Sequence, residues 1–136
     1  MAPQTIDLAA HNTDLVRTGY AAFARGDLVA VEALFAPDAV WHAQRLGRLG
    51  GDHRGWPAVL KFFADSMELT AGSFRIDVEE VLANDTGAAV VVRSNGRRGE
   101  HVLDDRQIHL FRLEGDRVME VWQFVGDGAT VESFWS

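Results

Sequence analysis

The stretch 102-VLDDRQIHLFRLEGDRVMEVWQFV-125 holds two runs of strand-forming residues on either side of the short sequence EGD (114–116). Both runs are rich in valine, phenylalanine and other residues that fit a pleated sheet, and a short break containing glycine is typical of a β-hairpin turn. We therefore predict that residues 102–113 and 117–125 are long antiparallel neighbours.

Two further strands are predicted ahead of this hairpin. In residues 74–79 (FRIDVE) apolar and charged side chains alternate, which is the period of a strand with one buried face. Residues 88–94 (AAVVVRS) are apolar and β-branched, as a strand favours. The turn that follows this strand falls either at Asn95-Gly96 or at residues 98–100, because both contain a glycine.

The beginning of the chain predicts two short helices that meet at Gly26. Asn12 or Thr13 can cap the first helix, apolar residues follow at helical spacing, and Gly26 ends it. Asp27 can cap the second helix, which ends by Pro37 because proline cannot continue a helix.

A strand, a loop and a third helix come next. Residues 39–43 (AVWHA) form a short strand, and residues 45–55 form a loop because three glycines fall within five positions. Pro57 stands where a helix begins, and apolar residues continue at helical spacing to about Thr70. This order of elements predicts an α+β fold in which helices cover one face of a curved, mostly antiparallel sheet.

Composition and charge narrow the class of protein. With 136 residues, 47% of them hydrophobic, the chain predicts one globular domain over residues 1–136. A net charge of −7 opposes nucleic-acid binding, and no apolar run is long enough to cross a membrane, so we expect a cytoplasmic protein that binds neither. Cysteine is absent and the five histidines lack the spacing of metal ligands, so we expect neither a metal nor a cofactor.

The last predicted strand carries apolar side chains on both of its faces. They fall in two phases, with Val118, Trp122 and Phe124 in one, and Met119, Val121 and Val125 in the other. A strand with one face in water should have polar residues in one of the two phases. We therefore expect helices to cover one sheet face and a second copy of the chain to cover the other, as a homodimer.

The order and spacing of these elements resemble a known family. A helix, then ARGDLVAVEALFAPDAVWH (24–42), a loop ending in HRGWPAVLKFF (53–63) and strands ending in GDRVMEVWQFV (115–125) resemble the SnoaL-like branch of the nuclear-transport-factor-2-like superfamily. That superfamily includes polyketide cyclases, ketosteroid isomerases, scytalone dehydratase and limonene epoxide hydrolase. The resemblance covers a core of residues 12–126 and leaves a tail of residues 127–136. It implies a cone-shaped sheet wrapped around three N-terminal helices, an apolar pocket between them, and dimerisation through the outer sheet face.

The resemblance also bears on two histidines. In ketosteroid isomerases an aspartic acid donates a hydrogen bond from the strand that QIHLFRL resembles, and alignment without gaps places His109 there. The aspartate base lies on the strand that DAVWHAQ resembles, where the alignment places Ala43, which argues against isomerase activity itself. A regular strand turns Trp41 into the pocket and His42 away from it, whereas a one-residue bulge turns His42 inward.

His109 and His42 are the candidate acid/base groups, because imidazole titrates near neutral pH, and we expect both to face the pocket. Further residues are expected to bind the substrate: Gln123, Trp41, Tyr20, Phe111, Trp56, Phe63 and Asp105, the last toward the pocket mouth. The expected function is a cofactor-free acid/base enzyme that isomerises, cyclises, dehydrates or hydrates a small hydrophobic carbonyl-containing molecule. The alternative is a non-catalytic, small-molecule-binding dimeric domain of the same fold.

Overall fold

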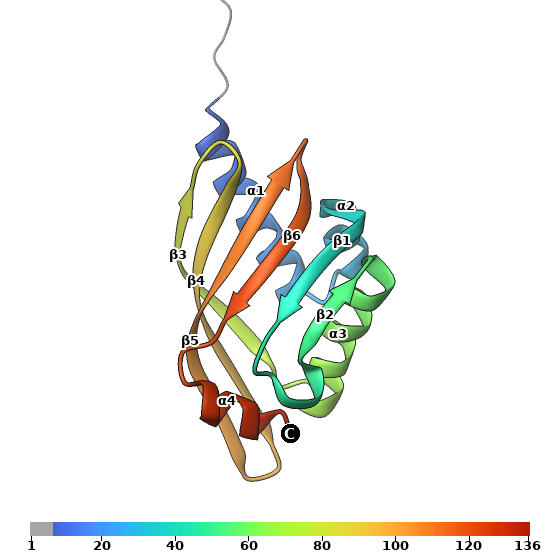
Figure 1. Cartoon of the computed structure of the whole chain (residues 1–136), viewed down its shortest axis with the longest axis vertical. Helices are drawn as coiled ribbons and strands as arrows, with labels where there is room; N and C mark the ends of the chain where they lie inside the picture. The colour runs from blue at the N-terminus through green and yellow to red at the C-terminus, as the bar shows by residue number, and fades with distance from the viewer. Residues whose placement is uncertain (1–6) are drawn as a thin grey trace, which may run out of the picture.

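In the computed structural model, which describes residues 7–136, four α-helices and one short 3₁₀ segment accompany six strands. The elements in chain order are α1 (Leu8–Ala24), α2 (Leu28–Leu34), β1 (Phe35–Ala43), η1 (Gly47–Leu49), β2 (Gly51–Arg54), α3 (Trp56–Leu69), β3 (Arg75–Ala83), β4 (Gly87–Arg98), β5 (His101–Glu114), β6 (Arg117–Phe124) and α4 (Gly128–Phe134). Figure 1 shows the first three helices along one side of the sheet and α4 near one end of it.

The six strands form one sheet in the order β2-β1-β6-β5-β4-β3. Neighbouring strands are antiparallel except β1 and β6, which run parallel. The predicted hairpin is confirmed, because β5 and β6 are joined by Gly115 and Asp116, both with the positive φ of a type I′ turn. The predicted α+β class, with helices on one face of a mostly antiparallel sheet, is also confirmed.

The first helix begins earlier than predicted. Asp7 caps α1, and its side chain accepts a hydrogen bond from the backbone N–H of Ala10 at 3.1 Å. Asn12, one of the two expected caps, is buried inside the helix and donates to the backbone oxygen of Asn84 at 2.9 Å. Thr13, the other, also lies within the helix.

The second helix is capped by Asp27 as predicted, but it ends before Pro37. The chain enters β1 directly, and Pro37 lies within that strand, where the pairing with β6 shifts between Phe35 and Val40. Proline has no N–H to give to a sheet ladder, so it fits the irregular part of the strand. Beyond this part β1 is regular up to Ala43.

Residues 45–55 were predicted as a loop, but they contain η1 and the edge strand β2, which pairs with β1. Gly51 has a φ of 118°, a conformation that favours glycine and lets β2 fold back onto β1. The third helix agrees with the prediction, since α3 begins at Trp56 with Pro57 in its first turn.

The C-terminal segment packs against its own domain. β4 continues to Arg98, so the turn before β5 lies at residues 99–100 and not at Asn95-Gly96. After β6 the chain forms α4, which ends with the buried residues Phe134 and Trp135. The ring of Trp135 meets that of Phe74 edge-on, with the ring centroids 5.6 Å apart.

The two faces of the sheet are clearest on β5, where buried and exposed residues alternate along the strand. The inner residues of β5, which face the helices, are Leu103, Asp105, Gln107, His109, Phe111 and Leu113. On the outer face Ile108 and Leu110 are exposed. Of the helices in residues 7–136, none is long and apolar enough to span a membrane.

Candidate active site

A cavity lies between the inner face of the sheet and helices α1, α2 and α3. Its volume is about 70 Å³, several times the ~10–15 Å³ that one water molecule requires. Aromatic rings from α1, α3, β1, β5 and the C-terminal segment form much of its wall. The polar side chains of the wall are Tyr20, Ser66, Ser94, Gln107, His109 and Gln123. A mostly apolar cavity with a few polar groups is the usual form of a small-molecule site.

His109 is buried, with 1% of its surface exposed, and it lines this cavity from β5. Its Nδ1 lies 2.6 Å from the hydroxyl oxygen of Tyr20 on α1, and the two rings stack. Burial lowers the pKa of His109 to about 3, so the imidazole is neutral near pH 7. Burial also raises the pKa of Tyr20 well above its ordinary value, so the phenol keeps its proton.

The hydrogen bond between these two side chains fixes the tautomer of His109. A phenol is a stronger acid than a neutral imidazole, so we assign the Tyr20 hydroxyl as the donor to Nδ1. The ring hydrogen of His109 then resides on Nε2, which has no hydrogen-bond partner among the described residues. A buried N–H without an acceptor is unfavourable, so Nε2 of His109 is an open hydrogen-bond donor on a residue of the cavity wall.

A row of side-chain hydrogen bonds crosses the inner face beside His109. Nε1 of Trp41 donates to Oε1 of Gln123 at 2.9 Å, and Nε2 of Gln123 donates to Oε1 of Gln107 at 2.8 Å. Nε2 of Gln107 then donates to Oδ2 of Asp105 at 3.0 Å. All three donors point toward the carboxylate, so the row holds the Trp41 ring and both amides in fixed orientations along the wall.

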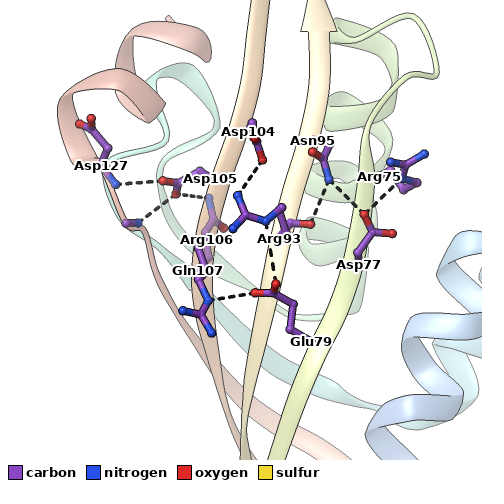
Figure 2. A network of polar contacts seen from close by, with 11 residues as sticks. Arg75, Asp77, Glu79, Arg93, Asn95, Asp104, Asp105, Arg106, Gln107 and Asp127 are labelled. Atoms are coloured by element: carbon purple, nitrogen blue, oxygen red, sulfur yellow. Dashed lines mark hydrogen bonds and ion pairs between the residues drawn. The ribbon is translucent and has the colours of Figure 1, made fainter.

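Asp105 does not line the cavity, which corrects its expected place at the pocket mouth. Its carboxylate also accepts hydrogen bonds from the backbone N–H groups of Gly126 at 2.9 Å and Asp127 at 3.0 Å (Figure 2). These contacts fix the segment that leads from β6 into α4. Trp135, near the end of that segment, forms part of the cavity wall, so Asp105 holds a segment that lines the cavity although it does not line the cavity itself.

Most of the other residues expected to bind a substrate do line the cavity. They are Gln123, Trp41, Tyr20, Phe111 and Phe63. Trp56 does not belong to the wall. It is buried behind Phe35, with the ring centroids 5.4 Å apart, and supports that ring from outside the cavity.

Ser94 is a cavity residue that the sequence prediction missed. It lies on β4 in phase with Val90 and Val92, which are also buried. A hydroxyl residue in the buried phase of a valine-rich strand is the signal that could have identified it. Its Oγ, like Nε2 of His109, has no hydrogen-bond partner among the described residues.

His42 lies on the outer face of the sheet, so its predicted place in the pocket is wrong. The irregular part of β1 comes before Val40, and no extra residue interrupts the strand from Val40 to Ala43. Trp41 and Ala43 are therefore buried on the inner face, and the His42 side chain points away from them.

The surroundings of His42 are an ionic cluster. Its ring stacks on Trp122, and its two nitrogens lie 2.7 Å from Asp52 and 2.5 Å from Glu120. Partial burial acts to lower the pKa of His42, but the hydrogen bonds with Glu120 and Asp52 outweigh it, and the pKa is raised. The sheet separates this cluster from His109, so the two predicted catalytic histidines do not meet.

Ion pairs also cover the outer face of β3, β4 and β5. Arg93 lies 3.0 Å from Asp104, and Arg106 lies 2.9 Å from Glu79 (Figure 2). Exposed pairs of this kind contribute little to stability, and they lie on the face opposite the cavity.

The fold and the cavity define a class of protein: an α+β domain whose bent sheet and helices enclose an apolar, small-molecule-sized cavity with a buried histidine. Residues 16–132 match the sequence profile of the family described as the SnoaL-like domain. The chain belongs to this SnoaL-like family, and its fold is the NTF2-like fold.

Two relatives are similar to this chain over almost the whole of their length. An uncharacterized protein of Mycobacterium tuberculosis is 36% identical over 124 residues, which cover 90% of this chain and 95% of that protein. The structure of Bal32a, from a soil-derived mobile gene cassette, has a TM-score of 0.92 and 31% identity over 95% of this chain and 99% of its own.

More distant structures share the fold alone. An NTF2-like protein of Burkholderia xenovorans has a TM-score of 0.80 and 21% identity over 94% of this chain and 98% of its own. A protein assigned as a SnoaL-like polyketide cyclase, from a Jannaschia species, has a TM-score of 0.77 and 15% identity over 99% of both chains.

Proposed function

We propose that this protein is a cofactor-free acid/base enzyme that acts on a small, hydrophobic, carbonyl-containing molecule. One observation carries the proposal: the neutral imidazole of His109 lines an apolar cavity, its Nε2 has no hydrogen-bond partner among the described residues, and Tyr20 is bound to its Nδ1. A protein assigned as a SnoaL-like polyketide cyclase shares this fold, which makes a carbonyl-containing molecule the class of substrate to test first.

The chemistry that this arrangement favours is enolisation. A substrate carbonyl oxygen would accept the hydrogen bond from Nε2 of His109, and negative charge would grow on that oxygen as a water molecule in the cavity takes the proton from the adjacent carbon. In an apolar cavity a fixed donor stabilises such charge far more than water does. As charge grows, the Tyr20 hydroxyl strengthens the donor by its own hydrogen bond to Nδ1.

The substrate would also supply part of the reactivity. The cavity wall formed by the described residues contains no aspartate, glutamate, lysine or arginine. Strong general-base catalysis by a wall carboxylate is therefore absent, and the rate enhancement would come from stabilisation of the enolate. A carbon acid that is already activated, such as a β-dicarbonyl or a benzylic ketone, suits this site best.

The test measures proton exchange at the carbon next to a carbonyl. β-Tetralone, a hydrophobic ketone with activated C–H bonds, is incubated with the protein in D₂O, and loss of its α-proton signals is followed by NMR. We expect His109→Ala to slow the catalysed exchange about 100-fold, as loss of an oxyanion donor does, and Tyr20→Phe to slow it about tenfold.

His101→Ala is the matched control, because this histidine lies at the exposed start of the same strand. It should leave the exchange unchanged. Full exchange activity in His109→Ala would refute the role of His109.

The alternative function is a non-catalytic binding domain for the same class of molecule. The absence of a carboxylate from the described cavity wall favours it, because a binding site needs no base. The same samples separate the two functions: binding of β-tetralone that depends on His109 but brings no exchange of its protons supports the binding domain.

We also propose that the protein is a homodimer formed through the outer face of the sheet. Ile108, Leu110 and Phe124 are exposed there, and the pairing of β5 with β6 brings them together with Trp122. Charges of both signs surround this apolar patch, which suits contact with a two-fold-related copy of the same face.

We therefore expect a dimer in solution, and we expect Leu110→Asp to convert it to a monomer by burying a charge in the patch. The molar mass from analytical ultracentrifugation at micromolar concentration checks this. Val102→Asp, at an exposed position toward the start of the same strand, should remain dimeric. A monomeric wild-type protein would overturn the proposal.

A further inference from the structure

A second residue of the cavity wall, far along the sheet from His109, carries a buried polar atom without a partner. Ser94 on β4 has 1% of its surface exposed, it lines the cavity, and its Oγ makes no hydrogen bond with any described residue. Ser66, the other serine of the wall, differs because its hydroxyl donates to the backbone oxygen of Phe63 at 2.7 Å. A buried hydroxyl left without a partner is unfavourable, so Ser94 is the exception that requires an explanation.

The register of the sheet gives the separation of the two residues that carry these atoms. Ser94 lies opposite Asp105, and His109 is four residues further along β5 on the same inner face. At about 3.3 Å per residue, the two positions are about 13 Å apart along the strand direction. The two residues therefore lie toward opposite ends of the inner face.

The wall between and around these two ends is apolar. Phe74 and Ile76 line the cavity at the Ser94 end, and Trp41 and Phe111 line it at the His109 end. Gln107 lies between the two ends and Gln123 lies opposite His109, but their amides are already bonded to each other. Since the described wall carries no charged side chain, an ionised group at either end would be desolvated without a counterion.

We propose that the site takes an elongated, uncharged, mostly apolar molecule with one oxygen function at each end. Its carbonyl accepts the hydrogen bond from Nε2 of His109, and its far end carries a hydroxyl or a second carbonyl that pairs with Oγ of Ser94. A serine hydroxyl both donates and accepts, so it fits either group. The His109 end rests on the proposed function, whereas the Ser94 end rests only on the partnerless hydroxyl and its place in the cavity.

Two probes of the same shape test the Ser94 end. They are para-acetylbiphenyl and its derivative with a hydroxyl at the far para position, and their binding is measured by titration calorimetry. We expect the wild-type protein to bind the hydroxylated probe about fivefold to tenfold more tightly, and we expect Ser94→Ala to abolish that preference. Ser66→Ala is the matched control, and it should change the affinity for both probes by the same factor.

A second measurement needs no ligand. Because Oγ of Ser94 has no partner in the unliganded chain, Ser94→Ala should raise the melting temperature by about 3 °C, while Ser66→Ala should lower it. A lower melting temperature in Ser94→Ala, no binding of the hydroxylated probe to the wild type, or a preference that survives Ser94→Ala would each overturn the inference.

Failure of this inference can be distinguished from failure of the proposed function. Para-hydroxybiphenyl lacks the carbonyl, and Ser94→Ala should weaken its binding by about the same fivefold to tenfold in the wild-type and His109→Ala backgrounds alike. If His109→Ala leaves the affinity for para-acetylbiphenyl unchanged, the carbonyl role of His109 fails while the Ser94 end stands. If only the Ser94 preference is missing, the proposed function stands and the two-ended ligand is refuted.

Discussion

Acidification from about pH 7 to about pH 4.5 should lower the free energy of unfolding by about 3 kcal/mol through His109 alone. In the unfolded chain this histidine titrates near pH 6.5, whereas burial lowers its pKa to about 3 in the folded protein. Between these two values the unfolded chain binds a proton that the folded chain excludes. Stability therefore falls as the pH falls through this window, and the loss is complete only below about pH 3.

The measurement is urea unfolding at both pH values, compared between the wild type and His109→Gln. Glutamine can still accept the hydrogen bond from Tyr20 but does not titrate, so the variant should lose about 3 kcal/mol less than the wild type on acidification. His101→Gln, which removes an exposed histidine from the same strand, should behave as the wild type.

The comparison with a variant is needed because other groups titrate in the same range. The raised pKa of His42 stabilises the folded protein at acid pH, and this stabilisation is lost as the pH rises through the folded pKa. His42 therefore opposes the effect of His109 on stability. Asp52, Glu120 and Asp127 have lowered pKa values, so their contributions are lost on acidification. An equal acid dependence in the wild type and in His109→Gln would refute the burial of a neutral imidazole.

The fold could be predicted wherever the residues of a single helix or strand contain the pattern that identifies it. The hairpin of β5 and β6 is confirmed because alternation, β-branched residues and the EGD turn all indicate the same structure. The start of α1 and the strand β2 were missed for a different reason. Asp7 is a cap outside the range of apolar periodicity, and β2 is a four-residue edge strand defined only by its pairing with β1.

The residues of the candidate site likewise divide into those that local patterns could predict and those that they could not. His109 could be predicted because it lies within a 14-residue strand whose alternation fixes the inner phase. The phase of His42 could not be predicted, because it depends on whether the irregularity of β1 lies before Val40 or after it, and both positions agree with the same letters. The phase of β4 indicates that Ser94 is buried, but whether its hydroxyl has a partner depends on the three-dimensional surroundings, so no local pattern could reveal that.

The role of Asp105 likewise depends on distant residues, and it leads to the second large expected effect. Three donors converge on this buried carboxylate: the side-chain amide of Gln107 and the backbone N–H groups of Gly126 and Asp127. Asp105→Ala leaves all three without an acceptor, and hydrogen bonds to a charged group contribute more than neutral ones. We expect the free energy of unfolding to fall by about 4 kcal/mol, measured by urea denaturation.

The same substitution should also open the cavity from one side. The segment that Asp105 holds continues into α4 and ends with Trp135, which forms part of the cavity wall. Once the two backbone contacts are lost, residues 126–135 should exchange their amide hydrogens faster than the central strands do, which mass spectrometry detects at peptide level. Amide exchange in β5 and β6 should rise only by the amount that the lower free energy of global unfolding explains.

Asp104→Ala is the matched control for both measurements. Asp104 is the neighbouring residue, but its carboxylate is exposed on the outer face and pairs with Arg93. Loss of an exposed ion pair should cost less than about 1 kcal/mol and should leave exchange in residues 126–135 as in the wild type. Equal effects of the two substitutions would show that the C-terminal segment is held by the packing of Phe134 and Trp135 rather than by the Asp105 carboxylate.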